Sequence, residues 1–66
     1  MDGFSLESFK QDIKVLAVAE HWRPSQIQYA EDYIDALVAR GTDAPLQGLD
    51  PEYAQVIKEL YQLAID

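Results

Sequence analysis

Hydrophobic residues recur at helical spacing through most of this chain. The first stretch places five apolar side chains on one face: Leu6, Phe9, Ile13, Leu16 and Ala17. Ser5 before them is a suitable N-cap, and Glu7 follows in the first turn, where the helix dipole favours an acid. Phe4 and Phe9 stand at the positions of a hydrophobic staple. The spacing predicts a helix over residues 6–21.

A proline and a glycine bound a second helical stretch. Pro24 disfavours a helical residue before it, and Ser25 with Gln28 forms the pattern of a capping box. Gly41 is a suitable residue to end a helix, because glycine adopts the left-handed conformation readily. We therefore predict a helix over residues 25–40.

The third helix has the strongest start signal. Asp50 and Pro51 are an N-cap followed by proline at the first helical position. The apolar stripe behind them contains Tyr53, Ile57, Leu60 and Ala64, with Val56 and Leu63 beside it. The remaining face is polar, so we predict a one-sided surface helix over residues 51–65. Before it, Leu46 and Leu49 are expected to tuck onto the core.

Together these elements predict an all-α fold, a compact three-helix bundle in one domain of residues 1–66. A chain of 66 residues is marginally stable and usually needs an additional source of stability. It has no cysteine, so disulfides are excluded. Two possible sources of additional stability remain: very good helix packing, or association into a dimer or a complex.

A second apolar stripe lies nearly opposite the first on the N-terminal helix. It consists of Val15, Val18 and Trp22, with Ala19 near them. A helix that is apolar on nearly all sides is normally buried on both faces. Two arrangements fit: the other two helices sandwich this one, or another protein chain covers the second stripe.

The second predicted helix has three different faces. Its core-facing residues are Ile27, Ala30, Ile34, Leu37 and Val38. Tyr29 and Tyr33 form an aromatic edge. Glu31, Asp32 and Asp35 occupy the remaining side, and the like charges at positions 31 and 35 destabilise a helix by a few tenths of a kcal/mol. No base on the same helix offsets them, so this face is either simply solvated or meets a basic partner.

Charge excludes some partners. Twelve acids and five bases give a formal net charge of −7, which repels nucleic acid and anionic membranes. The N-terminus is acidic where a signal peptide would be basic, and the longest apolar run, residues 15–19, is too short to span a bilayer. We therefore expect a cytoplasmic protein without direct nucleic-acid or membrane binding.

The chain lacks the residue patterns of a catalytic, metal or cofactor site. There is no cysteine nucleophile, and the single histidine, His21, has no orienting partner nearby in sequence. Ser5 and Ser25 are accounted for as helix caps. No glycine-rich phosphate loop or calcium-binding loop is present. We therefore predict a chain without enzyme activity, metal or cofactor.

Aromatic residues beside an acidic face are typical of protein interfaces. The predicted partner-binding residues are Val15, Val18, Trp22, Tyr29, Glu31, Asp32, Tyr33 and Asp35. They predict a non-catalytic interaction module, an acidic regulator or inhibitor of a larger protein with a basic or apolar surface, or a homodimer. Two alternatives remain: a nucleic-acid mimic that inhibits a DNA- or RNA-binding enzyme, and a small structural subunit of an enzyme assembly.

Overall fold

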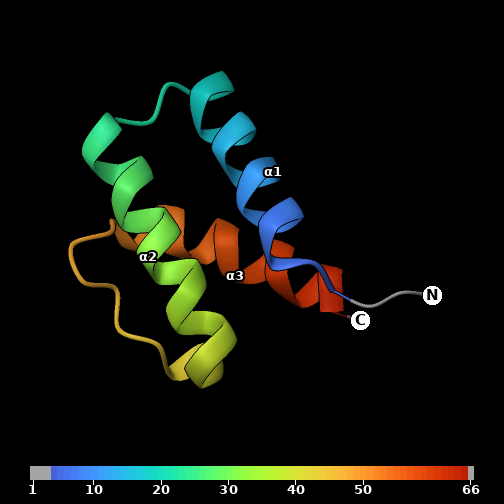
Figure 1. Ribbon diagram of the computed structural model, residues 1–66. Helices are drawn as coiled ribbons and strands as arrows, with labels where there is room; N and C mark the ends of the chain where they lie inside the picture. Colours follow the sequence, from blue (N-terminus) through green and yellow to red (C-terminus); the bar gives the residue numbers. More distant parts are fainter. Residues whose placement is uncertain (1–3, 66) are drawn as a thin grey trace.

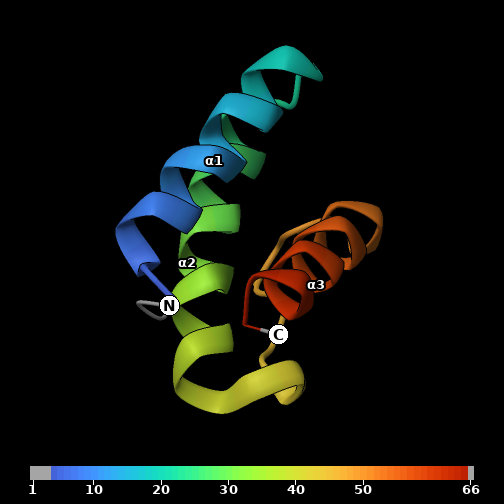
Figure 2. The same cartoon turned by 90° about the vertical axis from the view of Figure 1, so that its right-hand side faces the viewer.

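The computed structural model describes residues 4–65, except for the side chain of Thr42, and shows an all-α three-helix bundle (Figure 1). Helix α1 spans Leu6–Ala19, α2 spans Pro24–Arg40 and α3 spans Pro51–Ile65, with a short 3-10 turn, η1, at Gly41–Asp43. Figure 1 shows α3 running obliquely behind α1 and α2, and Figure 2 shows it on one side of that pair. Helix α2 packs against both α1 and α3, whereas α1 and α3 touch one another least.

The hydrophobic core is centred on α2. Among the residues that the structure describes, three of the four largest fully buried side chains, Tyr33, Ile34 and Leu37, belong to this helix, and the fourth is Ile57 of α3. Helix α1 contributes its predicted stripe, with Phe9 and Ile13 among the buried residues. The expected all-α bundle is therefore confirmed. A search of residues 4–65 found no helix with the length and hydrophobicity of a membrane span.

The buried face of α2 is rotated relative to the predicted one. Val38, predicted to face the core, is 44% exposed, while Gln26 and Tyr33 are buried instead. Helix α2 contacts both α1 and α3, so its buried face is directed between these two neighbours. Viewed around the helix axis, the buried arc extends from the side of Tyr33 to the side of Ile34 and leaves Val38 outside it.

Both predicted features at the start of α1 are confirmed. The Ser8 backbone N–H donates to the Ser5 side-chain oxygen at 3.3 Å, as expected for an N-cap. The Phe4 and Phe9 rings lie with their centroids 5.5 Å apart. Tyr61 of α3 meets both rings edge-on, at 5.3 and 5.9 Å. The hydrophobic staple thereby also joins the start of α1 to the end of α3.

The predicted capping box at Ser25 and Gln28 is wrong. Helix α2 begins at Pro24, and the N-cap is Arg23, whose side chain makes no capping hydrogen bond. Proline lacks a backbone N–H and has a helix-compatible φ angle, so it is suited to the first helical position. It excludes only the preceding residue from the helix, and Arg23 is accordingly extended, with φ −65° and ψ 145°.

Helix α1 ends two residues earlier than predicted, in a left-handed turn. The His21 N–H donates to the Val18 carbonyl at 3.2 Å, and the Trp22 N–H donates to the Ala17 carbonyl at 2.9 Å. These two bonds form a Schellman motif, with His21 at φ 62° in the position usually held by glycine. The turn changes the direction of the chain before Trp22.

We predict that His21→Gly will raise the free energy of unfolding by about 0.5–1 kcal/mol, because glycine adopts positive φ without steric penalty. Urea denaturation followed by circular dichroism measures the change. Glu20→Gly is the matched control: Glu20 has φ −93°, so glycine there should destabilise. Equal effects of the two substitutions would contradict a strained backbone at His21.

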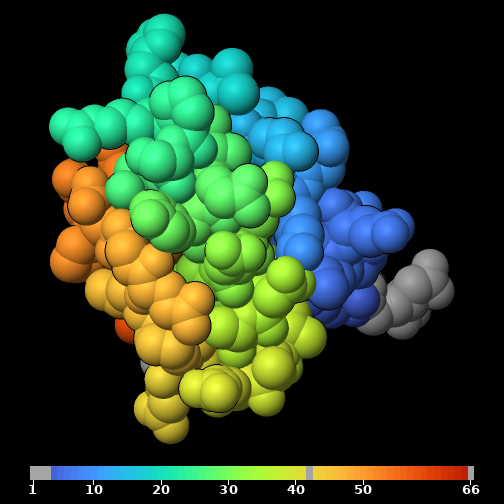
Figure 3. All heavy atoms as spheres, turned by 60° about the vertical axis from the view of Figure 1, so that its left-hand side comes forward, coloured from blue at the N-terminus to red at the C-terminus, as the bar shows by residue number. Residues whose placement is uncertain are grey.

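The segment between η1 and α3 is held against the start of α2. The buried Gln26 side chain donates to the Gly48 carbonyl at 3.3 Å and accepts from the Asp50 N–H at 2.8 Å. Leu49 is buried and Leu46 packs on the core, as predicted. Figure 3 shows this segment lying along α2. Gln26 therefore links α2 to the residue that precedes α3.

Candidate functional site

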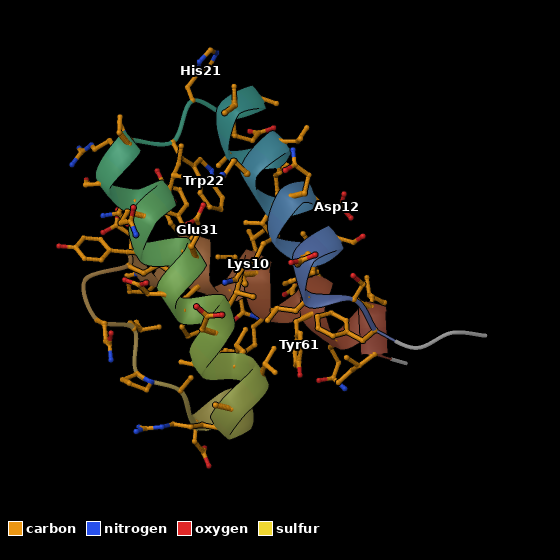
Figure 4. All side chains as sticks on the ribbon, viewed as in Figure 1. Lys10, Asp12, His21, Trp22, Glu31 and Tyr61 are labelled. Atoms are coloured by element: carbon orange, nitrogen blue, oxygen red, sulfur yellow. The ribbon has the colours of Figure 1, made fainter. Side chains whose placement is uncertain are left out.

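Trp22, predicted to bind a partner, is a core residue. It is only 8% exposed, and its ring stacks on Tyr53 of α3 with centroids 4.3 Å apart and an interplanar angle of 24°. Figure 4 shows its side chain turned inward, whereas His21 points outward. The helical wheel placed Trp22 beside Val18 only because the helix was extended past its true end at Ala19.

Tyr33, the second aromatic predicted at the interface, is also in the core. Among the described residues, no hydrogen-bond partner exists for its buried hydroxyl. Burial raises the pKa of Tyr33 above the ordinary value of 10.0, because the ionised phenolate is poorly solvated there. The folded state therefore binds the Tyr33 proton more tightly than the unfolded state does, which stabilises the fold below about pH 10. That contribution is lost as the pH rises through the folded-state pKa.

We predict that Tyr33→Phe will raise the free energy of unfolding by about 1 kcal/mol at neutral pH, since it removes a buried hydroxyl without a partner. It should also reduce the loss of stability above pH 10. Urea denaturation at a series of pH values tests both effects. Tyr29→Phe is the control, because Tyr29 is exposed; if it reproduces the alkaline effect, Tyr33 is not responsible.

Tyr29 is exposed but is not free on all sides. Its ring covers Gly48, and a Cβ atom added to that glycine would lie 2.9 Å from the ring. Gly48 has φ 99°, a conformation that other residues rarely adopt. Tyr29 thus helps to hold the segment before α3, and only its outer part is available to a partner.

The carboxylates of α2 are partly neutralised within the chain. Lys10 of α1 pairs with Asp35 at 2.7 Å, and Lys14 pairs with Glu31 at 3.3 Å. The sequence analysis considered only bases on the same helix, whereas the bases that pair with these acids are on α1. Such exposed ion pairs stabilise only weakly, by about 0.2–1 kcal/mol each. Asp32 is exposed beside them.

The second apolar stripe of α1 is not covered by the other helices. Val15 and Val18 are 59% and 64% exposed, so of the two arrangements considered, the sandwich of α1 between α2 and α3 is wrong. Cover of this stripe by another protein chain stays a prediction. Trp22, which was predicted to belong to this stripe, is buried in the core instead. The two valines are neighbours on one face of α1 and remain exposed there as a small apolar patch.

Two hollows of the described surface lie between α1 and α3, the pair of helices with the fewest mutual contacts. The first has a volume of about 280 Å³ and is lined by Phe9, Asp12, Ile13, Leu60, Leu63 and Ala64. The second has a volume of about 410 Å³ and is lined by Leu16, Glu20, Trp22, Glu52, Tyr53 and Val56. The two hollows share no lining residue but follow one another along α1 and α3, and we refer to them together as the α1–α3 groove. It is walled mainly by apolar side chains, with Leu63 at its edge 72% exposed.

The charged residues lining the groove are all acidic: Asp12, Glu20 and Glu52. Figure 4 shows that Asp12 and Lys10 leave α1 in different directions. Lys10 and its neighbour Lys14 reach α2, where they form the ion pairs. Helix α1 therefore directs Lys10 and Lys14 toward α2 and Asp12 toward the groove.

The sequence analysis did not identify this groove as a site. One signal was present, because Val56 and Leu63 lie beside the main stripe of α3 and make its apolar face wider than one neighbouring helix can cover. The contribution of α1 depends on how the two helices are packed together, which a single helical wheel does not contain.

The groove offers apolar contact and negative charge. No group of three or more potential metal ligands occurs within the part of the chain that the structure describes. Two exposed apolar residues of α3, Val56 and Leu63, are available for contact. Comparison with protein-family models, with curated proteins and with solved structures found no match for this chain.

Proposed function

We propose that this chain is a non-catalytic protein-interaction module, a small acidic helical regulator or inhibitor that binds a larger protein. The observation that carries the proposal is the α1–α3 groove, whose walls are mainly apolar and remain accessible. Apolar surface that stays accessible in a small protein commonly marks an interaction site. We therefore assign the proposed binding surface to the groove, whereas the sequence analysis had assigned it mainly to residues of α2.

The nucleic-acid mimic is less well supported. Such a protein needs a row of carboxylates free to replace phosphates. On α2, Glu31 and Asp35 are paired with lysines of α1, so two of the three acids on that face are partly neutralised. An apolar interface also resists salt, whereas a mimic releases its target as salt screens the charges.

Site-specific photo-crosslinking in a native lysate tests the proposal. A photoreactive residue replaces the exposed Leu63 in one variant and Gln62, on the polar side of α3, in the other. We expect one protein to be captured from position 63, at low and high salt, but not from position 62. Capture of a nucleic-acid-binding enzyme that is lost at high salt would favour the mimic. Equal capture from both positions would contradict a specific interaction through the groove.

A further inference from the structure

We propose that the α1–α3 groove binds an amphipathic helix of a partner protein, with an apolar face bordered by lysine or arginine. This inference rests on the proposed function and gives the chemistry of the partner for the same surface. It depends on three features of the groove: the spacing of its two hollows, the charge around them and the side chains that form their walls.

The spacing of the hollows suits a helix. The α1 residues that line the first hollow, from Phe9 to Ile13, precede those that line the second, Leu16 and Glu20, by about seven positions. Seven residues of α-helix measure about 10 Å. A partner helix with apolar residues at positions i and i+7 presents them on one face at the same spacing. Such a helix would lie over the two hollows, in contact with both α1 and α3.

The charge around the groove selects a basic partner. Asp12 lies at the first hollow, and Glu20 and Glu52 lie at the second, with no base lining either of them. A basic helix would place its flanking charges against these acids. A second copy of this chain carries the same acids and a net charge of −7, so self-association through the groove would bring like charges together. Anionic lipid is disfavoured for the same reason.

The walls of the hollows differ in chemistry. Aliphatic Ile13, Leu60 and Leu63 predominate in the first, which suits a branched aliphatic side chain. The second is bounded by the stacked rings of Trp22 and Tyr53. Aromatic walls favour an aromatic or methionine side chain, which makes ring contacts. The partner helix is thus expected to carry an aliphatic and an aromatic or methionine anchor two turns apart.

Three synthetic peptides of about 18 residues, five helical turns, provide the probes. The first has an apolar face with leucine and phenylalanine anchors seven residues apart and lysine on both borders. The second replaces each lysine with glutamate, and the third has the first peptide's composition in scrambled order. Trp22 is the single tryptophan and lines the second hollow, so its fluorescence reports binding to the full chain. We expect the second and third peptides to bind at least about tenfold more weakly.

Two matched pairs of variants locate the site. Val56, in the groove, is 38% exposed, and Val38, on α2 outside it, is 44% exposed. Val56→Asp should weaken binding of the lysine peptide at least about tenfold, and Val38→Asp by less than about twofold. Asp12→Lys should likewise weaken binding more than Asp32→Lys. Circular dichroism of each variant confirms that the helices are retained.

Each contrary outcome has a defined meaning. Equal binding of the lysine and glutamate peptides would overturn the charge requirement, and equal effects of the two valine variants would place binding outside the groove. A dimer of the free protein that Val56→Asp dissociates would show that a second copy covers the groove. If crosslinking at Leu63 captures a partner through a segment that is not a basic helix, this inference fails while the proposed function stands.

Discussion

Replacing Trp22 with alanine is expected to lower the free energy of unfolding by about 3–5 kcal/mol, the usual range for removing a large aromatic side chain from a core. The residue is buried and joins the turn after α1 to α3 by stacking on Tyr53. Small domains have a total stability of only about 5–15 kcal/mol, and a chain of 66 residues lies toward the lower end. We therefore expect Trp22→Ala to be largely unfolded in mild urea.

The control is Trp22→Phe, which retains an aromatic ring beside Tyr53 and should lose much less stability. Urea denaturation followed by circular dichroism measures both variants. If Trp22→Ala instead leaves the stability unchanged and impairs partner binding, the result would support the partner-binding role that the sequence predicted for Trp22.

The second large effect is expected for Gln26→Ala. This substitution removes the side chain that bonds the Gly48 carbonyl and the Asp50 N–H. A buried polar group left without a partner costs about 1–3 kcal/mol. Both bonds are only part-buried, so water can replace them in part, and we expect a total loss of about 2 kcal/mol. Hydrogen exchange should become faster in the segment before α3 and in its first turn.

Two further variants accompany Gln26→Ala: Gln28→Ala as a control, and Gln26→Glu to distinguish the two hydrogen bonds. Gln28→Ala removes an exposed glutamine from the same helix, and its effect should stay within about 0.5 kcal/mol. Gln26→Glu keeps an acceptor for the Asp50 N–H but places an oxygen against the Gly48 carbonyl. If Gln26→Ala and Gln28→Ala have equal effects, the link between α2 and α3 does not depend on this side chain.

The existence and order of the helices could be predicted from the sequence because their signals are local. Ser5 as a cap, Gly41 after α2 and Pro51 at the start of α3 each act within one helical turn. The errors occurred at the connection between α1 and α2. His21 has a left-handed conformation without being glycine, and Pro24 begins a helix that Ser25 was expected to cap.

The surface could be predicted less well, because it depends on how whole helices are placed. The early end of α1 moved Trp22 from the predicted interface to the core. The ion pair between Lys14 and Glu31 requires the alignment of two helices, which neither helical pattern contains. The groove depends in the same way on the crossing of α1 and α3.

The short connection between α1 and α2 has a consequence for how the chain folds. Only residues 20–23 separate these helices, whereas residues 41–50 separate α2 from α3. Closing a short loop loses less entropy than closing a long one, and proteins rich in local contacts fold quickly. We therefore expect the α1–α2 hairpin to be already formed in the transition state for folding, and α3 to dock after it. Core substitutions in α3, such as Ile57→Val, should then mainly accelerate unfolding and leave the folding rate nearly unchanged.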